Sequence, residues 1–143
     1  MKILLVFALT LALAAGYAQR PTNVPLQDLE AIQTIIRAQI EAFRKDDGAT
    51  AYSFASPSIR QVFPDSKVFM EMVKSGYPQI YRSLTVEFAQ ATRNSADEVL
   101  QIVNLIGRDG SRAVAAYLMQ RQPGGVWKIN GVQMNVEPRP GNA

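Results

Sequence analysis

Two adjacent aspartates, Asp46 and Asp47, are the residues of this sequence best suited to proton-transfer chemistry. A carboxylate held in an apolar pocket can act as a general base, with a tyrosine hydroxyl as the proton donor. Neighbouring side chains at the end of a helix point in different directions, however, and an aspartate there often caps the helix that follows. The pair therefore has two interpretations, a catalytic base or a structural cap, and we expect the structural one.

Two missing residue types restrict the chemistry further. The 143 residues include no histidine and no cysteine, which excludes thiol catalysis, disulfides and histidine-based triads within this chain. The acidic residues do not fall at metal-ligand spacings, and no glycine-rich phosphate loop precedes a helix. We therefore predict no metal and no cofactor. The net charge of +3 is small and its basic residues are scattered, so no nucleic-acid partner is predicted.

Aromatic residues offer a second kind of candidate site, a pocket for an apolar ligand. They crowd between residues 52 and 81, and the later strands contribute more. Ordinary core packing explains most of them, but an incompletely filled core would hold a ligand. Tyrosines suit the mouth of such a pocket because they combine an apolar ring with a polar tip. The candidate lining residues are Phe54, Phe69, Tyr77, Tyr81, Tyr117 and Trp127.

The first residues, MKILLVFALTLALAAGYAQR, have the layout of a secretory signal peptide. The apolar run over residues 3–15 is shorter than the roughly 20 residues that span a bilayer. Gly16 and Ala18 fit a cleavage site, and cleavage after Ala14 also fits. We therefore predict a signal peptide over residues 1–18, an exported protein, periplasmic or secreted, and no membrane span after signal removal. An uncleaved N-terminal anchor is the alternative.

After the predicted signal peptide, the spacing of apolar residues changes once along the chain, from a pattern typical of helices to one typical of strands. From Pro25 to Asp47, apolar residues recur at spacings of three and four, which predicts one long amphipathic helix with Asn23 as a candidate cap. Residues 47–75 predict two or three short helices, capped by Asp47, by Ser56 and by either Asp65 or Ser66. Glycine and proline after this segment end the last of them.

From Ser83 onward the apolar residues alternate with polar ones, which predicts strands. Four are expected, starting at Leu84 and running through Val136, with a β-bulge at Gly131. The fold class is therefore α+β: a long N-terminal helix and two or three short helices packed on a curved four-stranded antiparallel sheet. The predicted organisation is a lead-in over residues 19–25, a single domain over 26–136 and a flexible tail over 137–143.

This order of elements, ending in VWKINGVQM, resembles the cystatin-like cone of the nuclear-transport-factor-two-like superfamily, which includes SnoaL-like proteins. A narrower set of residues resembles the bacterial exported domain-of-unknown-function family 4864. That set comprises Gln39 with Ala42-Phe43, Asp46-Asp47, Phe54-Ala55-Ser56-Pro57, Phe69 with Met72-Val73, and Gly76-Tyr77-Pro78. The family has no assigned activity, so the resemblance implies an exported domain of this fold and no particular chemistry.

We therefore expect a non-catalytic module that binds a small apolar molecule or lipid, or that docks on an envelope protein partner. The superfamily resemblance implies one alternative, an isomerase- or cyclase-like enzyme with Asp46 or Asp47 as the base and a tyrosine as the proton donor. It also implies a homodimer formed through the open face of the sheet. The depth of the two aspartates discriminates between enzyme and module, since a base must face a closed apolar cavity.

Overall fold

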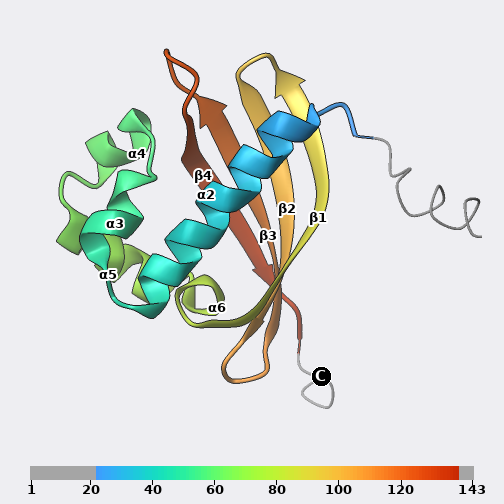
Figure 1. Cartoon of the computed structure of the whole chain (residues 1–143). Helices are drawn as coiled ribbons and strands as arrows, with labels where there is room; N and C mark the ends of the chain where they lie inside the picture. Colours follow the sequence, from blue (N-terminus) through green and yellow to red (C-terminus); the bar gives the residue numbers. More distant parts are fainter. Residues whose placement is uncertain (1–21, 139–143) are drawn as a thin grey trace, which may run out of the picture.

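Helices precede strands along the whole chain, so the two kinds of element form separate layers (Figure 1). The computed structural model describes residues 22–138, and the predicted signal peptide lies outside them. The helices are α2 (Leu26–Arg44), α3 (Gly48–Ser53), α4 (Pro57–Val62), α5 (Ser66–Gly76) and α6 (Pro78–Tyr81). The strands are β1 (Ser83–Ser95), β2 (Glu98–Gly107), β3 (Arg112–Arg121) and β4 (Trp127–Val136). The predicted α+β class is confirmed.

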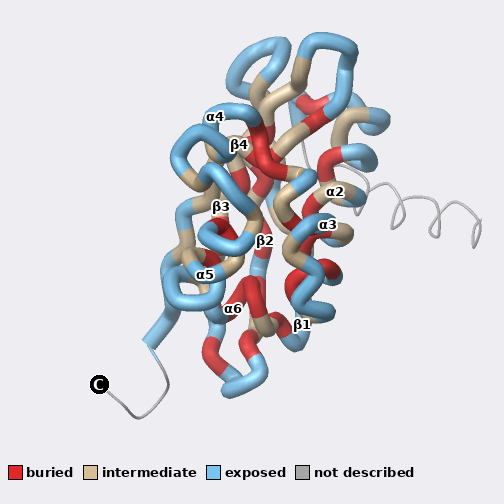
Figure 2. Tube along the Cα trace, turned by 90° about the vertical axis from the view of Figure 1, so that its left-hand side faces the viewer, coloured by how far each residue is buried: buried red, intermediate tan, exposed pale blue. Residues whose placement is uncertain are grey.

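Helix α2 runs diagonally across the sheet, and the short helices gather near its C-terminal end (Figure 1). Its apolar stripe is buried as the spacing predicts: Ile32, Ile36, Ile40 and Phe43 are all at most 1% exposed. In Figure 2 the buried parts of α2 alternate with exposed ones along the helix. Burial of this stripe against the sheet supplies most of the helix's stability, because isolated helices of this length are marginal in water.

The segment before α2 binds the sheet rather than capping the helix. The Asn23 side chain donates to the carbonyl of Arg93 (3.1 Å) and accepts the Arg93 N–H (2.8 Å). Thr22 donates to the carbonyl of Ala91 (3.0 Å). The prediction of Asn23 as the helix cap is wrong, because Pro25 occupies the cap position and no side chain caps the helix there.

The predicted caps Asp47 and Ser56 are confirmed, and of the two candidates for the last short helix Asp65, not Ser66, is the cap. Asp47 accepts the Thr50 N–H at 3.2 Å, and Asp65 accepts the Val68 N–H at 2.8 Å. Ser56 accepts the N–H of Ile59, the third residue of α4, at 3.4 Å. Each bond satisfies a backbone donor that a helix start leaves unpaired.

Helix α6 was not predicted from the sequence. We expected Pro78 only to stop the preceding helix, but it also occupies the first position of a new turn. Proline is well suited to that position because its missing N–H needs no partner there. This turn brings Ile80 and Tyr81 into the core, where both are buried.

The sheet is a simple antiparallel meander in the order β1-β2-β3-β4. The predicted bulge at Gly131 is confirmed: Gly131 pairs with Leu118, whereas Ile129 pairs with Met119, which leaves Asn130 as the extra residue. The alternation of apolar and polar residues predicts that Leu84 faces the core, but it is 62% exposed. The pairing register shifts between Ser83 and Thr85, at the start of edge strand β1, and this shift interrupts the alternation of inward and outward residues at Leu84.

The two faces of the sheet differ in burial. The face toward the helices is tightly buried, whereas residues on the other face, such as Leu100 and Ile102, are half-buried. The Glu137 N–H continues the ladder by donating to the carbonyl of Arg112 (2.8 Å), and residues 139–143 of the predicted tail lie outside the described part. Within residues 22–138, no helix has the length and apolar character needed to cross a membrane.

Candidate functional site

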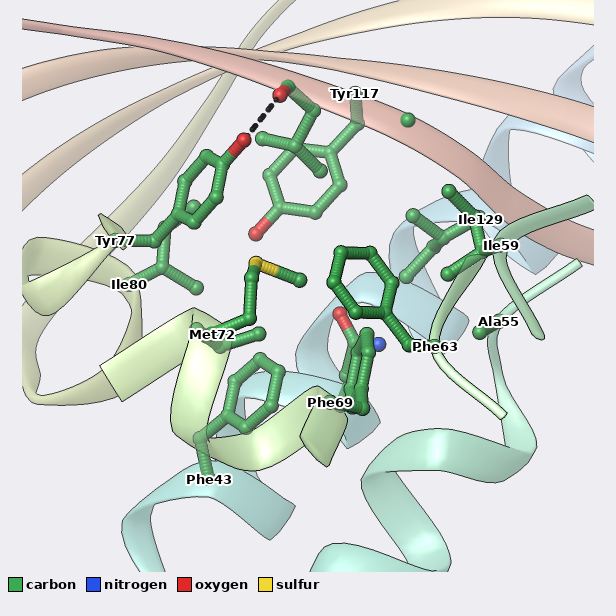
Figure 3. Close-up of a pocket in the computed structure, with 14 residues that line it drawn as sticks. Phe43, Ala55, Ile59, Phe63, Phe69, Met72, Tyr77, Ile80, Tyr117 and Ile129 are labelled. Atoms are coloured by element: carbon green, nitrogen blue, oxygen red, sulfur yellow. Dashed lines mark hydrogen bonds between the residues drawn. The ribbon is translucent and has the colours of Figure 1, made fainter. Parts of the chain in front are cut away.

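A cavity of about 220 Å³ lies between the C-terminal half of α2, the short helices and strands β3 and β4 (Figure 3). An engineered protein cavity of about 150 Å³ holds one benzene molecule, so this one has room for a substituted ring. Its lining consists of Gln39, Phe43, Ala55, Ile59, Phe63, Phe69, Met72, Val73, Tyr77, Ile80, Tyr117, Ile129, Gly131 and Val132. None of these residues is charged, so the cavity is suited to an apolar molecule.

The lining divides into a buried floor and a half-buried rim. The rim consists of side chains that reach solvent in part: Ile59 and Phe63 near α4, Met72 on α5, Tyr77 before α6, and Val132 on β4. The floor is formed by buried residues of the long helix and the sheet, among them Phe43, Ile129 and Tyr117. The cavity therefore opens between the short helices and β4.

Stacked aromatic rings form the helical side of the cavity. The rings of Phe43 and Phe69 lie 6.2 Å apart, Phe63 meets Phe69 edge-on at 6.3 Å, and Tyr52 lies 5.5 Å from Phe69. These separations lie within the favourable range for tilted aromatic pairs. Because the rings are engaged with one another, they form a wall and leave space between the helices and the sheet.

Two polar side chains of the lining have partners within the protein. The Tyr77 hydroxyl donates to the carbonyl of Val132 at 3.0 Å, which ties the start of α6 to β4 (Figure 3). The amide of Gln39 donates to the carbonyl of Ala51 at 3.1 Å and ties α2 to α3. Both groups fix the elements that frame the cavity.

Tyr117, the third polar side chain of the lining, differs from Tyr77 and Gln39 in its hydrogen bonding. It is fully buried, and its hydroxyl has no hydrogen-bond partner among the described residues. Figure 3 shows this hydroxyl pointing away from β3 and toward the helical side of the cavity. Burial raises the pKa of the Tyr117 phenol well above its ordinary value, because an apolar site disfavours the charged phenolate. The group therefore stays a neutral hydrogen-bond donor across the physiological pH range.

The structure brings together three of the six residues predicted to line a pocket. Phe69, Tyr77 and Tyr117 border the cavity. The tyrosines were expected at the mouth, and Tyr77 does lie at the rim, but Tyr117 lies on the floor. Strand β3 places Tyr117 there because it alternates inward with Ala115 and Met119.

The other three predicted residues lie outside the lining. Phe54 is half-buried, and its carbonyl accepts the Ile129 N–H at 2.8 Å. Trp127 is buried near the N-terminal end of α2, where its indole N–H donates to Asp28 at 3.4 Å. Tyr81 directs its hydroxyl to Asp46.

Sequence reasoning missed most of the helical side of the lining, above all Ile59, Met72 and Ile80. Their apolar spacing is the same whether they fill a core or border a void, so no pattern identified them. The one available signal was the serine–proline pair Ser56-Pro57, which fixes where α4 begins and hence where Ile59 projects.

Neither aspartate faces the cavity. Asp46 is exposed; it accepts a hydrogen bond from Tyr81 and two from Arg82 (2.7 and 2.9 Å). The Tyr81 and Arg82 hydrogen bonds lower the pKa of the Asp46 carboxyl. Asp47 caps α3 in solvent, and its hydrogen bonds with Thr50 lower its pKa too. A general base works best with a pKa near the working pH, so both pKa shifts run against that role.

The Asp46 interactions explain an unusual backbone conformation. Asp46 has a φ of 54°, a left-handed conformation that few residues other than glycine adopt. The Arg82 guanidinium also donates to the carbonyl of Phe43 at 2.6 Å. Arg82 and Tyr81 together thus anchor the end of α2 to the start of the sheet. No group of three or more acidic, histidine or cysteine residues that could hold a metal occurs within residues 22–138.

Comparison with known proteins identifies a family and a fold. A family model described as a domain of unknown function, DUF4864, matches residues 25–142. The crystal structure of an NTF2-like protein of unknown function from Shewanella baltica OS155 is similar, with a TM-score of 0.57 and 13% sequence identity. That match covers 82% of this chain and 100% of the other. At this identity the similarity shows the fold alone. No curated protein matches the sequence.

Proposed function

This chain belongs to the DUF4864 family, and we propose from its geometry that it is a module that binds a small, uncharged, apolar molecule in the cavity beneath the short helices. The observation that carries the proposal is the cavity itself: about 220 Å³, with no charged side chain in its lining. Natural cores are normally packed without voids of this size. A void of this size bordered by packed aromatic side chains is therefore best explained by a ligand.

The size of the cavity restricts the ligand. Sites for drug-sized molecules have volumes of about 300–1,000 Å³, so this cavity suits something smaller, such as a single aromatic ring or a short acyl chain. A ligand that buries about 200 Å² of apolar surface gains about 5 kcal/mol before the entropy cost of binding. Modest affinity follows, as suits a carrier or sensor that releases its ligand readily.

We further propose that binding takes place after export from the cytoplasm. The short apolar run followed by Gly16 and Ala18 supports this location. The mature protein would then start near Gln19, and an intact-mass measurement on exported protein tests the cleavage site. A mass that still includes Met1 to Ala18 would contradict it.

An enzyme of the isomerase or cyclase type receives no support from the site. Its base would have to be Asp46 or Asp47, and both lie outside the cavity with lowered pKa values. Asp46 does accept a hydrogen bond from a tyrosine, but that pair lies at the end of α2 and not in an apolar pocket.

The proposal is tested by measuring the binding of small apolar probes. Toluene and α-methylstyrene should bind the wild-type protein in isothermal titration calorimetry and raise its melting temperature. Met72→Trp places a larger side chain at the rim of the cavity and should abolish binding. Leu26→Trp adds the same ring on an exposed position (68% exposed) at the opposite end of α2 and should leave binding intact.

Circular dichroism establishes that both variants are folded before binding is compared. If neither probe binds the wild-type protein, the cavity is not a binding site for small apolar molecules. If Met72→Trp and Leu26→Trp bind the probes equally well, the probes bind elsewhere on the molecule. Either result would overturn the proposed function.

A further inference from the structure

The Tyr117 hydroxyl is a fully buried polar group that borders the cavity and has no hydrogen-bond partner among residues 22–138. Buried polar atoms in native proteins are paired in the large majority of cases. The other tyrosines around the short helices follow that rule: Tyr52 donates to the carbonyl of Phe63, Tyr77 to that of Val132, and Tyr81 to Asp46. Tyr117 is thus an exception that requires an explanation.

Packing alone does not require a hydroxyl at this position. A phenylalanine would fill the same space on β3, and it would avoid the cost of removing a hydroxyl from water without a partner. Tyr117 pairs with Gln101 on one neighbouring strand and Val132 on the other, and its hydroxyl hydrogen-bonds to neither. The hydroxyl extends past the sheet into the cavity (Figure 3).

We infer that the ligand of this cavity carries an uncharged hydrogen-bond acceptor, a carbonyl or ether oxygen, at its buried end, and that the Tyr117 hydroxyl donates to it. This inference rests on the proposed function and narrows its ligand class. The acceptor end would lie on the floor beside β3, and the apolar remainder would extend between Phe43, Phe63 and Met72 toward the rim.

The surroundings of Tyr117 fix the charge of that acceptor. None of the residues that line the cavity carries a positive charge, so a buried carboxylate or phosphate would lose its hydration without an ion-pair partner. The phenol itself stays protonated, since burial disfavours its charged form. It therefore offers a neutral donor, which matches a neutral acceptor.

A matched pair of probes tests the inference. Acetophenone and α-methylstyrene have nearly the same shape, but one presents a carbonyl oxygen where the other presents a methylene group. Their affinities are measured by calorimetry for the wild-type protein and for Tyr117→Phe, which removes only the hydroxyl. The ratio of the four dissociation constants isolates the hydroxyl–carbonyl interaction from the different hydrophobicity of the two probes.

We expect Tyr117→Phe to weaken acetophenone binding about five- to tenfold, the range of one neutral hydrogen bond, relative to its effect on α-methylstyrene. If both probes bind and the ratio stays within twofold of unity, the inference is wrong, although the proposed function stands. Benzoate, which has a charged acceptor on the same ring, should bind far more weakly than acetophenone. Comparable binding of benzoate would overturn the uncharged class. If no probe binds at all, the proposed function fails and the inference fails with it.

Discussion

Gln101 and Tyr117 face each other across strands β2 and β3, and both are fully buried. The Gln101 amide donates to the carbonyls of Ala89, Gln90 and Ile102 at 3.2, 3.3 and 2.9 Å. It also accepts a hydrogen bond from Gln33 at 3.3 Å. The hydroxyl of Tyr117 has no hydrogen-bond partner in the described part of the chain. A fully satisfied polar group and an unsatisfied one therefore lie side by side on adjacent strands.

The difference follows from what packs against each strand. Beside Gln101, edge strand β1 carries an irregularity between Phe88 and Ala91, and the amide fills it by bonding the displaced carbonyls. Beside Tyr117, the short helices leave a cavity instead of a partner. A satisfied buried polar group stabilises one particular fold, whereas an unsatisfied one at a void marks a site where local stability is sacrificed, commonly for function.

Phe43→Ala should have the largest effect on stability of the substitutions considered. Phe43 is 1% exposed and lies between Phe69 and Tyr81, with ring centroids 6.2 and 5.6 Å away. Truncating a core phenylalanine costs about 3–5 kcal/mol of unfolding free energy, measurable by urea denaturation. Leu84→Ala, at an exposed position, is the control and should change little. A loss below about 1 kcal/mol at Phe43 would mean that the cavity wall is not rigidly packed.

Gln101→Met should have the next largest effect, because methionine keeps the length of the side chain but removes its amide. Three carbonyls lose a donor, and we expect a loss of about 1–3 kcal/mol in unfolding free energy. Gln61→Met makes the same chemical change on the surface and serves as the control. Equal stability of the two variants would show that the hydrogen bonds of the Gln101 amide do not contribute to the free energy of unfolding.

Asp46→Asn tests the polar contacts that anchor α2 outside the cavity. The hydrogen bonds from Tyr81 and Arg82 lower the Asp46 pKa below its ordinary value of 3.8. The stability contributed by the charged Asp46 is therefore fully present above that value and is lost as the pH falls through the lower pKa of the folded state. Asparagine tolerates the left-handed backbone at this position, so the substitution removes charge without strain.

Urea denaturation of the wild-type protein and Asp46→Asn at pH 6 and near pH 2 measures this effect. The wild-type protein should be the more stable at pH 6, and the gap should narrow in acid. The expected effect is smaller than at Gln101, because the carboxylate is exposed and exposed ion pairs contribute little. A gap that does not depend on pH would mean that the Asp46 charge does not stabilise the fold.

Much of the fold could be predicted because it depends on local signals. The spacing of Ile32, Ile36 and Ile40 predicted α2, and side chains that cap their own helix starts, such as Asp47 and Asp65, gave the boundaries of the short helices. The failed prediction concerned a residue that bonds to a distant part of the chain. Asn23 has a partner 70 residues away on β1, and short-range reasoning assigned it to the nearest helix instead.

The candidate site could be predicted only in part. Tyr117 was among the candidate residues, but the unpaired state of its hydroxyl depends on how α2, the short helices α4, α5 and α6, and strand β4 are arranged around it. Trp127 was grouped with it because both are inward-facing aromatic residues of neighbouring strands. The register of the sheet places Trp127 opposite Arg121, at the far end of β3, near Asp28. Neither the composition nor the spacing of apolar residues indicates which residues of two neighbouring strands pair with each other.

Tyr117→Phe should have the smallest effect on stability. The sign of the change in unfolding free energy tests most directly whether Tyr117 differs from Gln101. Removing a hydroxyl that has a partner destabilises a protein, whereas removing a buried one without a partner relieves its desolvation cost. We therefore expect the unfolding free energy to stay unchanged or to rise by up to about 1 kcal/mol. Tyr81→Phe, which removes a hydroxyl bonded to Asp46, is the matched control and should lower stability.

The same denaturation measurements on the ligand-free protein decide between the two possible states of the Tyr117 hydroxyl. A loss of more than about 1 kcal/mol in Tyr117→Phe would mean that the hydroxyl is paired in solution, so that Tyr117 would resemble Gln101 and the contrast between the two would disappear. A neutral or stabilising result would mean that the folded protein gains nothing from this hydroxyl while the cavity is empty. Its contribution would then have to come from a molecule bound in the cavity, because a phenylalanine would serve the fold equally well.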